Sequence, residues 1–103
     1  MPLPGIIENN KASITELCKK HGVTELYVFG SAVRDDFTSD SDVDFALEYD
    51  YRNSIPDPLG NMLSLKTQLQ SLLKREVDLI EYSQVTNKYL KYFIDQEKMV
   101  LYA

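Results

Sequence analysis

Three aspartates interrupt the two most strand-like stretches of this chain of 103 residues. Residues 42–49 alternate between apolar side chains and polar or small ones, so the carboxylates of Asp42 and Asp44 project from the same face of a strand. Asp78 lies within the apolar run 77–82, where an unpaired buried carboxylate would cost several kcal/mol. If the two strands are neighbours, the three aspartates form a cluster that requires a cation, and Mg²⁺ prefers such oxygen ligands.

The acidic stretch admits two other interpretations. An aspartate beside a loop is often a turn or capping residue, which explains Asp42 alone or Asp78 alone as well as a metal site does. A calcium loop of the EF-hand type matches at Asp40, Asp42 and Asp44. However, Phe45 replaces the required glycine and Tyr51 replaces the bidentate glutamate, which excludes the calcium loop.

The turn that precedes the acidic stretch has the composition of a phosphate site. Gly30 and Ser31 end a buried strand abruptly. Glycine lets an anion approach the backbone N–H groups, serine adds a hydroxyl donor, and a short helix starting there would add its positive end. Arg34 could reach the same phosphate, or it could equally pair with Asp35 or Asp36 on the surface.

The hydrophobic periodicity of the whole chain predicts a single α/β domain, residues 1–103. Gly22 supplies the end of a first helix, and Asp57 with Pro58 marks the start of a second. Strands are expected at 26–29, 42–49 and 77–82, helices at about 8–21, 58–74 and 83–98, and a short extended end at 99–102. The side chains expected to face inward are Ile7, Ile14, Leu17, Cys18 and His21, then Leu59, Met62, Leu63, Leu69, Leu72 and Leu73, then Tyr89, Tyr92 and Phe93. This order predicts a small mixed sheet of three to four strands with helices mainly on one face.

Composition restricts the partners. Hydrophobic residues make up 44% of the chain, and 16 acidic residues against 11 basic ones give a net charge of −5, which makes nucleic acid an unlikely direct tight ligand. The pair Lys74 and Arg75 is expected to be a solvated helix end, and His21 to complement a helix dipole. The single cysteine, Cys18, allows no internal disulfide, and we expect it to lie in the core. No signal peptide or membrane-length apolar run is evident, so a cytoplasmic location is expected.

These residues carry a resemblance to a known family. The chain resembles the minimal nucleotidyltransferases of the DNA polymerase β superfamily, above all the MNT-type antitoxins that accompany HEPN-domain toxins. The resemblance spans nearly the whole chain and rests on Gly30-Ser31, Arg34, Ser41-Asp42-Val43-Asp44, Val77-Asp78-Leu79 and the closing residues 97–102. One departure is Asp35, where many relatives carry glycine, and this could stiffen or shift the loop.

The resemblance implies a polymerase β-like fold and a two-metal transfer of a nucleoside monophosphate. Asp42 and Asp44 would hold two Mg²⁺ ions, and Gly30 and Ser31, with Arg34, would bind the phosphates of ATP. Asp78 would bind the catalytic metal and help to deprotonate the incoming hydroxyl.

For the partner, the resemblance implies transfer of AMP to a tyrosine hydroxyl on a HEPN-type toxin, which is thereby blocked. The alternative is a binding module that neutralises its partner by contact without catalysis. A resistance enzyme acting on small alcohols is disfavoured, because no substrate-recognition domain is evident. A homo- or hetero-oligomer is compatible with the sequence.

Overall fold

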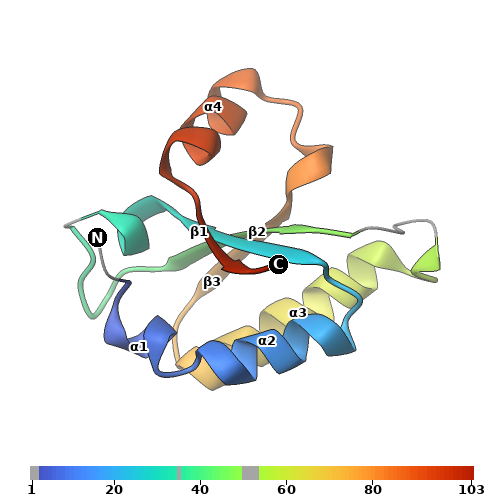
Figure 1. Ribbon diagram of the computed structural model, residues 1–103, viewed down its shortest axis with the longest axis horizontal. Coiled ribbons are helices and arrows are strands. Elements are labelled where there is room, and N and C mark those ends of the chain that lie inside the picture. Colours follow the sequence, from blue (N-terminus) through green and yellow to red (C-terminus); the bar gives the residue numbers. More distant parts are fainter. Residues whose placement is uncertain (1–2, 35, 50–53) are drawn as a thin grey trace.

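The computed structural model of the protein describes residues 3–34, 36–49 and 54–103. Four strands, four α-helices and two short 3₁₀ turns follow one another among these residues (Figure 1). In chain order they are α1 (Gly5–Glu8), α2 (Lys11–Lys20), β1 (Glu25–Phe29), η1 (Gly30–Val33), β2 (Val43–Glu48), α3 (Pro58–Leu73), β3 (Val77–Glu81), η3 (Tyr82–Gln84), α4 (Lys88–Glu97) and β4 (Met99–Tyr102).

The strands form one mixed sheet in the order β3-β2-β1-β4. The central pair β1–β2 is antiparallel, because the segment between the two strands is short, and β4 also pairs antiparallel with β1. Strand β3 runs parallel to β2, and α3 makes the crossover between them. The expected mixed sheet of three to four strands is confirmed, with four.

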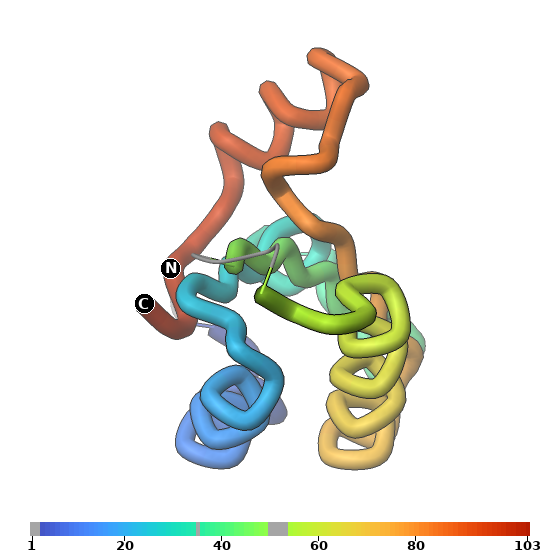
Figure 2. The backbone as a smooth tube through the Cα atoms, turned by 90° about the vertical axis from the view of Figure 1, so that its right-hand side faces the viewer, coloured from blue at the N-terminus to red at the C-terminus, as the bar shows by residue number. Residues whose placement is uncertain are grey.

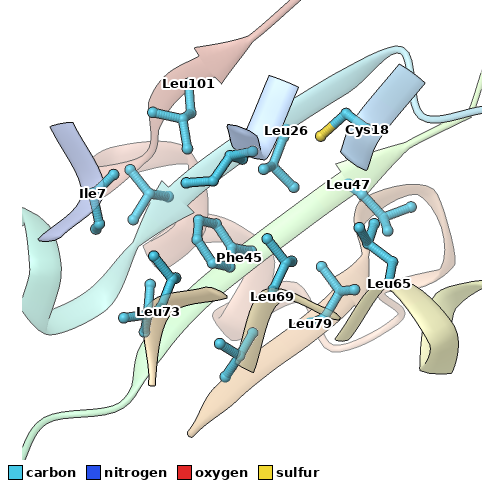
Figure 3. Close-up of a cluster of buried hydrophobic side chains, with 14 of the residues drawn as sticks. Ile7, Cys18, Leu26, Phe45, Leu47, Leu65, Leu69, Leu73, Leu79 and Leu101 are labelled. Atoms are coloured by element: carbon cyan, nitrogen blue, oxygen red, sulfur yellow. The ribbon is translucent and has the colours of Figure 1, made fainter. Parts of the chain in front are cut away.

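The helices α2 and α3 cover one face of the sheet, whereas α4 stands on the opposite side (Figures 1 and 2). The alternation of β2 places Phe45 and Leu47 toward α2 and α3, where both are fully buried. Leu26 of β1 and Leu69 of α3 complete the middle of this core (Figure 3). Because the core occupies one face, the polar positions of the same strands are left on the other face.

The helix boundaries follow local hydrogen bonds. As expected, Asp57 caps α3 by accepting the Gly60 N–H at 3.1 Å, and Gly22 follows α2 with a positive φ of 72°. The helix predicted at about 8–21 begins later, at Lys11, and the short helix α1 precedes it. Between the two, the Asn10 side chain turns back to donate to the Ile6 carbonyl at 2.7 Å. The last helix begins at Lys88 and not at Ser83, because the side chain of Asn87 caps it.

Several side chains predicted to face inward are exposed, which corrects the prediction. Leu59 and Leu63 in the first turns of α3 are 65% and 53% exposed, because this end of the helix extends beyond the core, and Leu65 is buried instead. On α4, Tyr89, Tyr92 and Phe93 are all more than half exposed, because only Ile94 of this helix packs fully inward.

His21 faces inward, as predicted. It is a buried residue whose ring lies within hydrogen-bonding distance of the Leu17 carbonyl, Ser64 and Gln68, and therefore links α2 to α3. Cys18 lies in the core as predicted. Within the described part of the chain, none of the helices is both long enough and apolar enough to cross a membrane.

Candidate active site

Two of the three predicted aspartates face each other on neighbouring strands. The parallel register of β2 and β3 places Asp44 directly beside Asp78, on the face of the sheet opposite the core. The two carboxyl groups are close enough to share a hydrogen bond. Asp42 lies one residue before β2 and is exposed. The condition set for the cluster, that the two strands are neighbours, is therefore met for Asp44 and Asp78. Asp42 lies just outside the strand that was expected to begin with it.

The electrostatics of Asp44 reflect this crowding. Burial of the carboxyl group, its hydrogen bond with Asp78 and the negative charges of Asp78 and Asp42 together raise the pKa of Asp44 to about 6. The positive charge of Arg34 acts in the opposite direction and is the weakest of these influences. At a pH between about 4 and 6, Asp44 in the metal-free chain thus retains a proton that an isolated aspartate would lose.

This arrangement fits a divalent cation. Asp44 and Asp78 bring carboxylate oxygens together, and such oxygens are the ligands that Mg²⁺ prefers. A bound cation would take the place of the proton on Asp44, and Asp42 adds a third carboxylate nearby. Over residues 3–34, 36–49 and 54–103, no three His, Cys, Asp or Glu side chains converge closely enough to form a ready metal cage. The donor set is therefore suited to an ion that also takes ligands from a bound substrate and water, as Mg²⁺ does.

The Gly30 turn lies against the acidic pair. Gly30 has a φ of 74°, and a Cβ atom at this position would collide with the Asp44 carboxylate, so only glycine satisfies both the turn and the close approach. Its neighbour Ser31 donates to the Asp42 carbonyl over 3.4 Å. The predicted phosphate residues and the predicted metal residues are thus adjacent in the structure.

Arg34 follows the turn and makes two ion pairs. Its Nε lies 3.3 Å from Asp36 Oδ1, which confirms the predicted surface pairing with Asp36. Asp35, the departure from the family pattern, lies outside the described residues. The stronger contact is to Glu97, at 2.8 Å from Arg34 Nη1, and the other oxygen of Glu97 accepts the Gly30 N–H at 3.1 Å. Sequence reasoning missed this role of Glu97, whose only signal was its place in the family-like ending.

Arg75 is a second residue that sequence reasoning misread. Its Nη1 donates to the carbonyls of Thr38 and Ser41, each at 2.8 Å, and its guanidinium lies 4.5 Å from the centre of the Phe37 ring. It is therefore not a solvated helix end, since it holds the loop that leads directly into Asp42. A basic residue two positions before a strand carries no sequence signal for such a contact.

The fold and this arrangement of carboxylates beside a Gly-Ser turn are those of a nucleotidyltransferase. The family model described as "Polymerase beta, Nucleotidyltransferase" matches residues 12–103, and the chain belongs to this family.

The relatives are named as protein adenylyltransferases. A relative from Methanocaldococcus jannaschii, provisionally named a protein adenylyltransferase, is 34% identical over 82 residues, which are 80% of each chain. The protein adenylyltransferase MntA of Thermococcus cleftensis is 40% identical over 65 residues, 63% of this chain and 62% of the relative. The chain is therefore an enzyme of the nucleotidyltransferase class that is similar to protein adenylyltransferases.

Among solved structures, this chain resembles a protein chain from the complex of a tri-AMPylated Shewanella oneidensis HEPN toxin with an MNT antitoxin. The TM-score is 0.67 with 21% sequence identity, and the alignment covers 93% of this chain and 71% of the other. At this identity the likeness concerns the fold, and it confirms the expected polymerase β-like architecture.

Proposed function

We propose that this protein transfers AMP from ATP to a tyrosine hydroxyl of a HEPN-domain partner and thereby acts as an antitoxin. The observation that carries the proposal is the Asp44–Asp78 pair, which faces away from the core and lies against the Gly30 turn. The names of the relatives, and the AMPylated toxin bound by a protein of the same fold, support AMP as the transferred group and a HEPN domain as the acceptor.

In this proposal the residues of the site bind the phosphates, hold the metal ions and accept a proton. Ser31 and Arg34 would bind the phosphates beside the Gly30 turn, and Asp42, Asp44 and Asp78 would hold two Mg²⁺ ions. Bound Mg²⁺ neutralises charge on the phosphate oxygens. The acceptor oxygen forms a bond to the α-phosphorus, the bond from that phosphorus to the bridging oxygen breaks, and pyrophosphate leaves. The hydroxyl proton passes to the Asp78 carboxylate, which is exposed on the open face.

A protein acceptor suits the surface of this chain better than RNA does. The net charge of −5 opposes binding to a phosphate backbone. Exposed apolar and aromatic side chains on α4, among them Tyr89, Tyr92 and Phe93, lie on the same side of the sheet as the acidic pair. The same surface favours one alternative, in which the protein neutralises its partner by contact alone.

Calorimetric titration of ATP tests the site without knowledge of the acceptor. We expect the wild-type chain to bind ATP in the presence of Mg²⁺ and to lose that binding in EDTA. Asp44→Asn should abolish the Mg²⁺-dependent part, whereas Asp40→Asn, which removes an exposed carboxylate of the adjacent loop, should not. A folded wild-type protein that binds no ATP would rule out the proposed enzyme.

Transfer itself distinguishes the enzyme from the contact module. The protein would be incubated with Mg²⁺, α-labelled ATP and a HEPN-domain protein of its own organism, and label on the acceptor would be located by mass spectrometry. The double variant Asp42→Asn/Asp44→Asn should transfer no label and should fail to neutralise the partner. Neutralisation that survives in this variant would establish the contact mode instead.

A further inference from the structure

The side chain of Glu97 joins the last residue of α4 to the nucleotide end of the site. Its two carboxylate oxygens have different partners: one accepts the Gly30 N–H at 3.1 Å, and the other faces Arg34 Nη1 at 2.8 Å. The Glu97 side chain is 24% exposed and that of Arg34 is 50% exposed. One carboxylate thus fixes both a backbone donor and a cationic side chain of the proposed phosphate site.

The Gly30 N–H needs such a partner. Gly30 is buried against Asp44, and a buried backbone N–H without an acceptor costs free energy comparable to a lost hydrogen bond. The left-handed conformation of Gly30 turns this N–H toward α4, where Glu97 meets it. Because this donor is satisfied within the protein, phosphate binding relies on Ser31 and Arg34 held in place by it.

The helix α4 does not depend on Glu97 for its position. Ile94 of α4 is fully buried, and the Tyr82 hydroxyl donates to the Asp95 carboxylate. The Lys98 ammonium, just after the helix, lies over the rings of Tyr27 and Tyr82 at 4.6 and 4.7 Å. Removal of the Glu97 carboxylate should therefore leave the helix in place and release only the turn and Arg34.

We propose that Glu97 is a positioning residue of the nucleotide site, acting through the Gly30 turn and through Arg34 to prepare both for the triphosphate. This inference rests on the proposed function. Without Glu97, the Arg34 side chain would keep only its exposed pair with Asp36 and would be less ordered, and ordering it would then oppose ATP binding. The carboxylate is 24% exposed, so the pairing is partly screened, but the geometry remains that of a charge-assisted contact.

The test compares ATP binding in the presence of Mg²⁺ among Glu97 variants of the full chain. We expect Glu97→Ala to weaken binding about tenfold, in keeping with the loss of a charge-assisted contact. Glu97→Gln should weaken it only about threefold, because its amide oxygen can still accept the Gly30 N–H while its NH₂ group faces Arg34 unfavourably. The matched control is Gln96→Ala, an exposed neighbour on α4, which should bind as the wild type does.

A double-mutant cycle shows whether Glu97 acts through Arg34. Glu97→Ala should cost clearly less in an Arg34→Ala background than in the wild type, since the shared contact is already lost. Additive losses would overturn the proposal for Arg34. Tighter ATP binding by Glu97→Ala would overturn it entirely, because the carboxylate would then be a competitor of the phosphates.

Hydrogen exchange at the Gly30 amide, measured by NMR on the ATP-free protein, supplies a readout that does not depend on the reaction. Protection of this amide should fall in Glu97→Ala, remain in Glu97→Gln and be unchanged in Gln96→Ala. If the wild type fails to bind ATP, the proposed function fails, and the amide still reports whether the contact exists. If the wild type binds ATP and Glu97→Ala binds it equally well, only the positioning role fails.

Discussion

Asp44 is the residue in which stability and the proposed chemistry oppose each other. Folding places its carboxyl group beside Asp78 and raises its pKa to about 6, from an ordinary value near 3.9. The folded state therefore holds the proton more tightly than the unfolded state does, so the free energy of unfolding falls as the pH rises from about 4 to about 6. Above that range the negative charge of Asp44 is repelled by those of Asp78 and Asp42 unless a cation is bound.

We accordingly predict that Asp44→Asn stabilises the metal-free fold. In EDTA at pH 7.5 its free energy of unfolding, measured with urea, should exceed that of the wild type by about 1 kcal/mol, a value reduced for solvent screening of a half-buried group. The gain should shrink below pH 6 and vanish near pH 4, where the wild-type carboxyl group is neutral as well.

Asp40→Asn is the matched control, because it removes the same charge from an exposed loop position. It should change the free energy of unfolding by less than about 0.5 kcal/mol at any of these pH values. A lower free energy of unfolding for Asp44→Asn than for the wild type in EDTA would contradict this prediction. It would mean that the Asp44–Asp78 pair stabilises the fold even without a cation.

At the scale of elements, the loop before β2 depends on a contact from the short segment between α3 and β3. Arg75 holds two carbonyls of this loop and packs on Phe37. We predict that Arg75→Ala lowers the free energy of unfolding by about 1–2 kcal/mol and weakens Mg²⁺-dependent ATP binding several-fold, since Asp42 follows the loop directly. Urea unfolding and calorimetry would measure the two effects.

Arg75→Lys should recover only part of each loss, because an ammonium group cannot hold both carbonyls in the plane of a guanidinium and stack on the ring as well. Lys20→Ala, which removes a positive charge from the exposed end of α2, should leave ATP binding unchanged. Equal binding by wild type and Arg75→Ala would show that Asp42 is positioned by the strand alone.

The elements themselves divide into those that local sequence determines and those that it does not. The strand β2 and the start of α3 follow from alternation and from the Asp57 cap, and both were predicted. The prediction of the inner face of α4 was wrong, because apolar periodicity does not tell which side of a helix packs against a sheet. Glu97 and Arg75 were missed for a related reason: each acts on a segment distant in sequence, and only the topology brings the two together.

For the whole molecule, the core lies between the sheet and the pair α2–α3, and Cys18 belongs to it. The thiol is fully buried, and this burial raises its pKa to about 12. A neutral, enclosed thiol does not attack alkylating reagents. We predict that iodoacetamide at pH 8 modifies the native protein only as fast as the chain opens, as followed by mass spectrometry.

Binding to the native state should slow this modification further, so Mg²⁺ with ATP should protect Cys18 although the thiol lies on the other side of the sheet from the proposed site. Protein unfolded in urea should react at the rate of a free thiol, and Cys18→Ala should take up no label. Rapid labelling of the folded protein would show that the packing of α2 against the sheet opens locally.

The parallel pairing of β2 with β3 and the contact of Glu97 with Gly30 have a consequence for protein synthesis. The ribosome makes the Gly30 turn and Asp44 early, Asp78 much later and Glu97 close to the last residue of this sequence. A nascent chain halted in α3 therefore carries half of the acidic pair and an Arg34 without its partner. Under the proposals made above, products terminated before Asp78 should not bind ATP with Mg²⁺, and products terminated between Asp78 and Glu97 should bind it more weakly than the 103-residue chain does.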